Sequence, residues 1–426
     1  MTQHSTHSEK DAARALPELG RFEFVALMAA LMSCTALSID PMLPALPDIG
    51  RDLAVLHDND RQMVVTFFFL GLAGGAIFYG PLSDHFGRKP VLLTALCFFF
   101  IFTMICALAP SFPILLAARL LAGFVAAACR VTVASIVRDR FQGDAMARMM
   151  SHIMMVFMIV PILAPSFGAA ILYFAPWRAI FWALAGVILC QLVWLALRLP
   201  ETLAKEYRVH IRPRDLGRMF VQIVTHRSSI GYMVASGVMM SGLVGYIVSA
   251  QQIFFDTFHQ PAMLPLGFAF IGTGMAFGSL FNSRLVERFG ARRMSQSAVI
   301  MLILLSAIHC GINMIGLESL WSFILLQALT VACFSFAGAN FSAIALEPFQ
   351  RGAGLASSLQ ASLMTFVSSG LGGMVGARFD GTTQPIALGF LTFGIAALLI
   401  ILWAERGRLF TRPGRSHLRT QSLPDR

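Results

Sequence analysis

An acidic residue within an apolar segment is the first feature that suggests chemistry. Asp40 lies about 17 residues into a segment that begins near Glu23, which places it roughly 25 Å along a helix. Ionisable residues in membrane spans are rare and mark ion or substrate pathways. Because desolvation favours the protonated carboxyl group, this acid can take up and release a proton. Alternatively the helix ends early, and Asp40 caps a turn formed with Pro41, Pro44 and Pro47.

Two arginines in the fourth apolar segment lie on nearly the same helical face. Arg119 falls near the depth of Asp40, so the two side chains can pair or compete through a cavity, and its guanidinium stays charged at any working pH. Arg130 follows about three helical turns later and lies deeper. Alternatives stay open for both: Arg119 can snorkel to the interface, and Arg130 contacts either an anionic substrate group or a neighbouring helix.

A short basic turn occurs twice in the chain. GPLSDHFGRKP starts at Gly80 and ERFGARR starts at Glu287, each after the second apolar segment of its half. An acid, a phenylalanine, a glycine and a basic residue are in register in the two copies. Many secondary transporters are built from internal repeats, with the site between them. The residues we single out are Gly80, Asp84, Gly87, Arg88 and Lys89 in the first copy and Glu287, Gly290 and Arg292 in the second.

Further polar and helix-weakening residues lie inside the apolar segments. Pro161, Pro165 and Gly168 fall in the outer half of the fifth segment, where they serve packing or else bend the helix and seal the outward side. We expect Glu347 to pair with a neighbouring arginine. The other polar residues are expected to be interhelical hydrogen-bond partners, His309 among them and not as a proton carrier: Gln251, Gln252, His309, Asn313, Gln327, Asn340 and Gln360.

Signatures of enzymes are missing from the sequence. It has no nucleophile elbow, no zinc-binding His/Glu pattern and no phosphate-binding glycine loop. The seven cysteines all fall in apolar segments and show no ligand spacing. We therefore expect no catalytic residue, no metal and no cofactor, and a protein that is not an enzyme and draws its energy from a gradient.

The elements that must position these residues are membrane helices. The 426 residues are 57% hydrophobic and 13% charged, with a mean hydropathy of +0.72, whereas soluble domains carry about 25% charged residues. A span needs about 20 apolar residues. The sequence predicts an all-α membrane protein with twelve spans, at Glu23–Leu46, Met63–Ser83, Val91–Ala109, Ile114–Val137, Met149–Phe174, Trp177–Leu197, Ile230–Phe254, Leu264–Leu285, Ser295–Ile315, Leu320–Leu346, Ala353–Ala377 and Pro385–Trp403.

The net charge of +10 is distributed unevenly. Arg and Lys crowd alternate connections, and the other connections carry only Arg51, Arg61, Arg178 and Arg378. By the positive-inside rule both termini are cytoplasmic, so the charge reports topology and no nucleic-acid partner is expected. The predicted organisation is a cytoplasmic tail at 1–21, a six-helix bundle at 22–199, a cytoplasmic linker loop at 200–228, a second six-helix bundle at 229–404 and a cytoplasmic tail at 405–426.

Several segments together resemble the major facilitator superfamily, and within it the Bcr/CflA subfamily of twelve-span drug:proton antiporters. SIDPMLPALPDIG is similar to the subfamily signature at the end of helix 1, and GPLSDHFGRKP to the loop between helices 2 and 3. RLLAGFVAAACRVTVASIVRDRF resembles the helix 4 motif, PILAPSFGAAI the antiporter motif of helix 5, and ALEPF the end of helix 10. Pro41, Ala291 and the missing Gly before Pro165 depart from the family pattern.

The resemblance implies roles for individual residues. Asp40 is the helix 1 acid linked to protons and substrate, and Arg119 the helix 4 arginine linked to proton coupling. Asp84, Gly87 and Arg88 belong to a gating loop, and Pro165 and Gly168 to the antiporter motif. The two pseudo-symmetric bundles are expected to rock around a central cavity in alternating access.

From this we expect a proton-coupled exporter of small amphipathic compounds in a bacterial inner membrane. Its partners are the substrate, protons and the lipid bilayer, and a monomer suffices. The alternatives are a proton symporter or uniporter that imports a metabolite, a membrane-embedded enzyme and a non-transporting sensor. The sequence does not identify the substrate.

Overall fold

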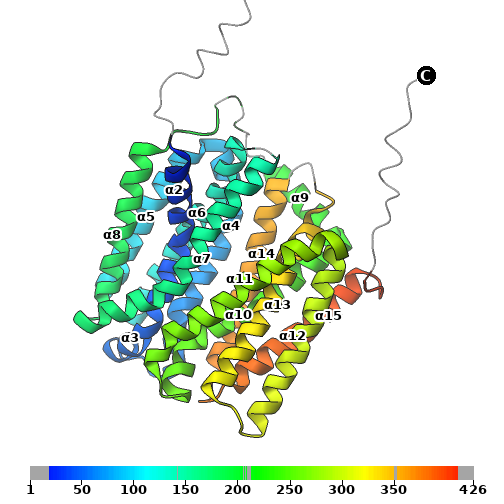
Figure 1. The fold of residues 1–426 in the computed structure, drawn as a ribbon. Helices are drawn as coiled ribbons and strands as arrows, with labels where there is room; N and C mark the ends of the chain where they lie inside the picture. Colours follow the sequence, from blue (N-terminus) through cyan, green and yellow to red (C-terminus); the bar gives the residue numbers. More distant parts are fainter. Residues whose placement is uncertain are drawn as a thin grey trace, which may run out of the picture.

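The computed structural model describes residues 19–141, 143–204, 206, 208, 213–349 and 353–410. Most of the predicted N-terminal and C-terminal tails lies outside these residues. The described part is helical throughout and contains no strand. Figure 1 shows the helices as two groups side by side, with α2 to α8 in one and α10 to α15 in the other.

The first half consists of six long helices with short helical segments at their ends. In chain order these are α2 (Arg21–Ile39), η1 (Asp40–Ala45), α3 (Leu46–Asp52), η2 (Asp58–Gln62), α4 (Met63–Phe86), α5 (Arg88–Leu108), α6 (Phe112–Arg140), α7 (Gly143–Phe174) and α8 (Arg178–Arg198).

The second half follows a linking helix and repeats this pattern. It consists of α9 (Pro213–Thr225), α10 (Arg227–Gln252), η4 (Ile253–Thr257), η5 (Pro261–Met263), α11 (Leu264–Phe289), α12 (Ala291–Met314), α13 (Leu320–Leu346), α14 (Ala353–Ala377) and α15 (Gln384–Ala404).

The predicted spans correspond to these long helices. Among the described residues, 11 helices are long and apolar enough to cross a membrane. The remaining predicted span, Ala353–Ala377, is α14 with the same bounds. Its many serines and glycines make it less apolar, and it packs between α4 and α10. The prediction of an all-α membrane fold is confirmed.

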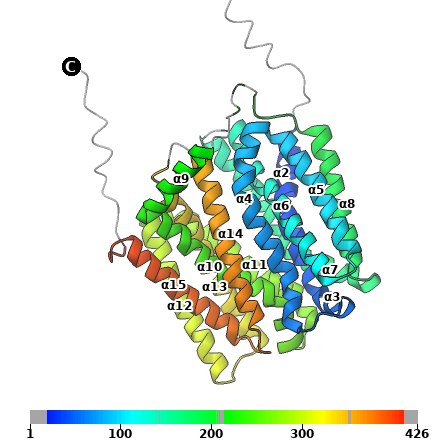
Figure 2. The same cartoon turned by 180° about the vertical axis from the view of Figure 1, so that it is seen from behind.

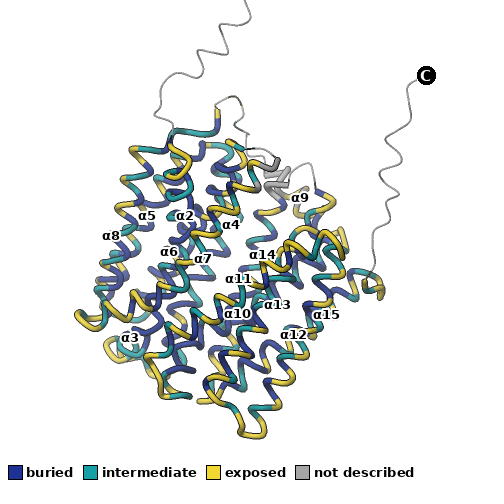
Figure 3. Tube along the Cα trace, viewed as in Figure 1, coloured by how far each residue is buried: buried dark blue, intermediate teal, exposed yellow. Residues whose placement is uncertain are grey.

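The outer faces of the bundles carry large apolar side chains. Phe270, Phe277 and Phe281 of α11 are all more than half exposed, and Figure 3 shows exposed positions recurring along the outer helices while α2 and α10 are largely buried. Contiguous apolar surface of this kind marks contact with lipid or a partner. A multi-pass membrane protein accounts for it.

The linker contains a helix that the sequence analysis did not predict. A polar loop was expected over 200–228, but α9 occupies Pro213–Thr225, with a proline at the first helical position, where no amide donor is needed. Its Ile223 is buried against the bundle, where α9 contacts α10 and α14, whereas Phe220 is exposed. Figure 2 shows α9 beside the upper part of α14. We call this the α9 end of the molecule and the opposite end, which holds α3, the α3 end.

Candidate functional site

The first span changes its helical form at Asp40. α2 ends at Ile39 and continues as the 3₁₀ segment η1 and then α3, because Pro41 and Pro44 lack the amide hydrogens that an α-helix needs. The chain therefore stays helical beyond Asp40, which is the C-cap residue of α2 but forms no capping hydrogen bond with its side chain. Asp40 is 6% exposed, and its carboxyl group has no hydrogen-bond or ion-pair partner among the described residues. Asp40 is therefore a buried, unpaired acid at the point where the α-helix changes to a 3₁₀ helix.

Arg119 holds this distortion in place from α6. Its Nε donates to the Val64 carbonyl at 3.0 Å and its Nη2 donates to the Ser38 carbonyl at 2.9 Å. In the 3₁₀ register the amide that would reach Ser38 belongs to Pro41, which has none, so the guanidinium supplies the missing donor. The guanidinium also lies 4.3 Å from the Phe68 ring centroid.

The position of Arg119 decides between the alternatives for this residue. It is 1% exposed, so it does not snorkel to an interface. In the part of the chain that is described it forms no ion pair with Asp40 or another acid. Its hydrogen bonds instead join α2 to α4. The acceptor in α2 is the carbonyl of Ser38, which lies two residues before Asp40 in the chain.

Gly168 of α7 permits a close backbone approach on the other side of Asp40. A Cβ atom at Gly168 would lie 2.0 Å from the Pro41 carbonyl oxygen, well inside contact distance. Pro165, one turn earlier, is buried, and Pro161 is half-buried within the same unbroken α7. The antiporter-motif residue Gly168 thus contacts the residue that follows the helix 1 acid, which the sequence did not predict.

The second half also contains buried polar groups without hydrogen-bond partners among the described residues. Tyr246 of α10 lies close enough to Asp40 for an electrostatic interaction, and its hydroxyl is buried with no hydrogen-bond partner in the described structure. The same holds for the side-chain amides of Gln251 and Gln327, which are fully buried. Buried polar groups are nearly always hydrogen-bonded, so these groups are available to a ligand or water.

The hydrogen-bonding role expected of these polar residues was wrong for Gln251 and Gln327. It is confirmed for Gln252, Asn340 and Gln360, whereas His309 and Asn313 bond Glu318 in the connection between α12 and α13. The partners of the first three are Asn59 for Gln252, Asn282 for Asn340 and Ser342 for Gln360. Tyr246 was missed altogether, since a lone tyrosine in an apolar segment carries no signal in the sequence.

Arg130 lies on nearly the same face of α6 as Arg119, about three turns further along, and has a different environment. It is exposed, whereas Arg119 is buried. It forms no hydrogen bond or ion pair with any described residue. Both alternatives for Arg130, contact with an anionic substrate group and contact with a neighbouring helix, stay predictions.

The first basic turn is the centre of a charge network at the α9 end. Arg88 Nη1 lies 2.5 Å from Asp84 Oδ1 and its Nε lies 2.9 Å from Asp139 Oδ2 of α6. Glu201, beyond α8, accepts from the backbone amides of Arg88 at 2.9 Å and Lys89 at 3.3 Å. The network links α4, α5, α6 and the start of the linker. Asp139 and Glu201 were not singled out in the sequence.

The second turn forms a corresponding network from different residues. Gly87 and Gly290 share an unusual backbone conformation, with φ values of +104° and +85°, which only glycine adopts without strain. Arg292 Nε lies 2.8 Å from Glu405 Oε1 and its Nη2 lies 3.4 Å from Glu347 Oε2. The predicted pairing of Glu347 with an arginine is confirmed. Glu287 is exposed and, in the described structure, pairs with no cation.

The two halves are joined across the α3 end. Arg61 Nη2 of η2 lies 2.8 Å from Asp256 Oδ2 of η4. Asn59 accepts from Gln252 Nε2 at 2.7 Å and donates to the carbonyls of Ala377 and Phe379 at 3.1 and 3.0 Å. These contacts connect η2 of the first half with η4, α10 and the end of α14 in the second half, so they tie the two halves together at this end.

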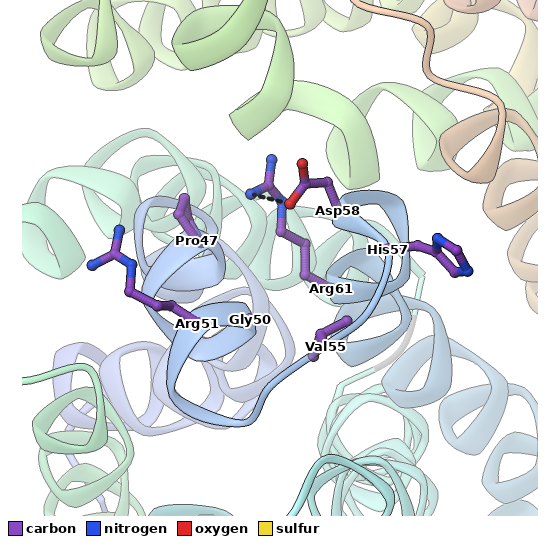
Figure 4. Close-up of a pocket in the computed structure, with 7 residues that line it drawn as sticks. All are labelled: Pro47, Gly50, Arg51, Val55, His57, Asp58 and Arg61. Atoms are coloured by element: carbon purple, nitrogen blue, oxygen red, sulfur yellow. Dashed lines mark ion pairs between the residues drawn. The ribbon is translucent and has the colours of Figure 1, made fainter.

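A small surface pocket adjoins Arg61. Figure 4 shows Arg61 beside Asp58 within it, with Arg51 and His57 pointing away from them. The pocket has a volume of about 290 Å³ and is lined by Pro47, Gly50, Arg51, Val55, His57, Asp58 and Arg61. It includes neither Asp40 nor Arg130 and is distinct from the buried polar groups of the second half.

A seam of small residues joins α4 to α14 along their length. Ser362 Oγ donates to the Ala73 carbonyl at 2.6 Å. A Cβ at Gly80 would meet Ser358 Oγ at 2.6 Å, and one at Gly373 would meet Thr66 at 2.8 Å. Gly80 thus belongs to the contact between the halves and not to the basic turn alone.

Two repeated six-helix bundles that meet around buried, unpaired polar groups define a secondary transporter. The family model described as Major Facilitator Superfamily matches residues 26–377. The chain therefore belongs to the Major Facilitator Superfamily.

Individual relatives and a solved structure agree with this assignment. The chain is 29% identical over 392 residues to the bicyclomycin resistance protein homolog of Haemophilus influenzae, covering 89% of this chain and 95% of that protein. It is 30% identical over 387 residues to the uncharacterized MFS-type transporter YdgK of Bacillus subtilis, covering 89% and 94%. The multidrug resistance protein MdtL of Escherichia coli is 31% identical over 208 residues, covering 47% and 52%. The fold resembles the crystal structure of the human organic anion transporter MFSD10, with a TM-score of 0.63, 18% identity and coverage of 91% and 100%.

Proposed function

We propose that this protein exports small amphipathic, drug-like compounds in exchange for protons, with Asp40 as the proton-carrying acid. The observation that carries the proposal is the carboxyl group of Asp40, which is buried in a helix distortion without any protein partner. A group in this environment has no fixed counter-ion, so its protonation follows access to the two sides of the membrane. Arg119 and Gly168 position it by holding the two ends of the distortion.

Drug export is supported by the names of the relatives. The similar proteins include a bicyclomycin resistance homolog and a multidrug resistance protein. Because resistance of this kind requires outward movement, we infer the same direction here. The compound is translocated without chemical change, and the proton gradient supplies the energy in place of a cofactor.

The setting we propose is a bacterial inner membrane with both termini in the cytoplasm. The α9 end then faces the cytoplasm and the α3 end the outside. A single chain contains both halves of the site, so a monomer suffices, and no nucleic acid is involved. Closure of the α3 end by Arg61 and Asp256 corresponds to a state that loads substrate from the cytoplasm.

The experiment uses everted membrane vesicles with a fluorescent dye substrate and an internal pH indicator. Wild type, Asp40→Asn and Asp48→Asn are compared. Asp48 lies in α3 of the same span and pairs with Arg51 at the surface, so its variant controls for loss of one carboxylate. We expect dye to accumulate and protons to leave the vesicle interior with wild type and Asp48→Asn, and neither with Asp40→Asn.

Other outcomes separate the remaining candidates. Dye movement without a pH response would show that transport is not coupled to protons and that the protein is a uniporter. Dye and protons that move in the same direction establish a symporter. Full activity of Asp40→Asn contradicts the role of Asp40.

A further inference from the structure

Arg130 lies deep within the first bundle on its inward side. It is ten residues from the end of α6 at Arg140, which corresponds to about 15 Å along the helix. The eleven residues between Arg119 and Arg130 are close to three full turns. Arg119 points between α2 and α4, so Arg130 projects in nearly the same direction, one level closer to the α9 end.

Arg130 is exposed without lying on the apolar outer face of α6. The structure describes Arg130 as exposed, in contrast to the buried Arg119 on the same helix. A lipid-facing position does not fit, because the exposed apolar residues Leu120 and Leu121 mark a different face of α6.

Arg130 forms no ion pair with any described residue, unlike several other arginines of the protein. Arg119 is satisfied by backbone carbonyls, and Arg61, Arg88, Arg198 and Arg292 each pair with a carboxylate. A guanidinium remains charged at every relevant pH. An unpaired cation at membrane depth is costly unless it meets an anion or water.

We propose that Arg130 binds a compact oxyanion of the substrate, a carboxylate in the first instance, so that the transported compounds are amphipathic anions. A guanidinium presents a planar fork of donors that fits a carboxylate in two parallel hydrogen bonds. This inference rests on the proposed transport function and adds the substrate class to it.

The test measures binding, not transport, with purified protein in lipid nanodiscs. The probe is N-dansylglycine, an amphipathic carboxylate, and its methyl ester is the matched neutral compound. Dansyl fluorescence gives the Kd of each for wild type, Arg130→Gln, Arg130→Lys and Arg138→Gln. Arg138 is exposed near the end of α6, so its variant removes the same charge from the same helix at another position.

We expect wild type and Arg138→Gln to bind the acid more tightly than the ester. Arg130→Gln should weaken binding of the acid about 10- to 100-fold and leave binding of the ester unchanged, which also shows that the variant is folded. Arg130→Lys should lose less, because it keeps the charge but not the fork.

Three results would overturn the inference. They are equal affinity of wild type for acid and ester, no binding of the acid by wild type, and an Arg130→Gln affinity for the acid equal to that of wild type. None of these depends on proton coupling. A failure of the vesicle experiment with Asp40→Asn is thus distinguishable from a failure here.

Discussion

At the scale of single residues, the environment of Asp40 depends on two residue types that lack an atom that other residues carry: proline, which has no amide hydrogen, and glycine, which has no Cβ. The missing amide hydrogen of Pro41 leaves the Ser38 carbonyl to Arg119, and the missing Cβ of Gly168 lets the Pro41 carbonyl approach α7. The same proline therefore shapes both sides of the acid. Substitutions at these positions should act on Asp40 without touching its carboxyl group.

The first prediction concerns Gly168→Ala. Its new Cβ would lie 2.0 Å from the Pro41 carbonyl oxygen, so α7 and η1 must separate, at a cost of about 1–3 kcal/mol in stability. We expect a lower Tm in detergent and lower dye export. Gly186→Ala is the matched control, since nothing lies within 4 Å of a Cβ in that position of α8. It should keep export and gain slightly in Tm. Equal behaviour of the two variants would contradict this account.

The sequence identified Asp40 and Arg119 from their type and depth, and both lie at the site. It did not predict that Arg119 binds the Val64 and Ser38 carbonyls instead of pairing with Asp40. The hydrogen bond to Ser38 forms because the change from α-helix to 3₁₀ helix leaves the Ser38 carbonyl without an amide donor. A pattern of residue types does not show this. Tyr246 was missed for a related reason, because its approach to Asp40 depends on packing between the halves.

At the scale of elements, the ion pair between η2 and η4 is a contact that must break when the α3 end opens. Arg61 is 8% exposed, whereas the Asp256 side chain is 45% exposed. A partly exposed pair contributes about 1 kcal/mol, enough to shift a population of two states about fivefold. The pair therefore biases the equilibrium between open and closed states without locking it.

The second prediction is a charge exchange at this pair. Arg61→Asp should place two acids together and increase the fraction of molecules open at the α3 end, measured as the distance distribution between spin labels on η2 and η4. The double variant Arg61→Asp with Asp256→Arg should return the distribution toward wild type. If the double variant is as open as the single one, the ion pair does not hold this end closed.

The third prediction compares the two basic turns. Arg88 is 3% exposed and holds Asp84, Asp139 and the Ser83 hydroxyl together. Arg292 is more accessible, and its contact with Glu347 is longer, at 3.4 Å. Each variant leaves one largely buried acid behind, Asp139 or Glu405, but removing Arg88 also empties a buried position and frees the Ser83 hydroxyl. We expect Arg88→Ala to lower Tm more than Arg292→Ala, and the reverse order would show that the second network is the stronger one.

The twelve helices and the division into halves were predictable because lipid imposes a long apolar run on each span. The repeat was only partly visible, since Ala291 stands where Arg88 stands in the first copy. The structure shows that Arg292 takes over, with Glu405 and Glu347 as partners. α9 was missed because the search was for long apolar runs, whereas the apolar residues of this 13-residue helix are interspersed with polar ones.

At the scale of the whole molecule, the two ends differ in how their arginines are neutralised. At the α3 end Arg51 pairs with Asp48, Arg61 with Asp256, and Arg178 with Asp52. The connections at the α9 end carry most of the net charge of +10. The uncompensated positive charge is therefore concentrated at one end, which strengthens the expectation that this end stays in the cytoplasm.

The fourth prediction follows from this asymmetry. A fluorescent protein fused after Phe410 should be fluorescent and alkaline phosphatase fused there inactive, because both report a cytoplasmic C-terminus. A phosphatase fused after Leu56, in the connection between α3 and η2, should be active. Phosphatase activity at Phe410 and none at Leu56 would show that the protein has the opposite orientation in the membrane. The closed α3 end would then face the cytoplasm, and Arg130 would be reached from outside, so the same binding site would serve import in place of export.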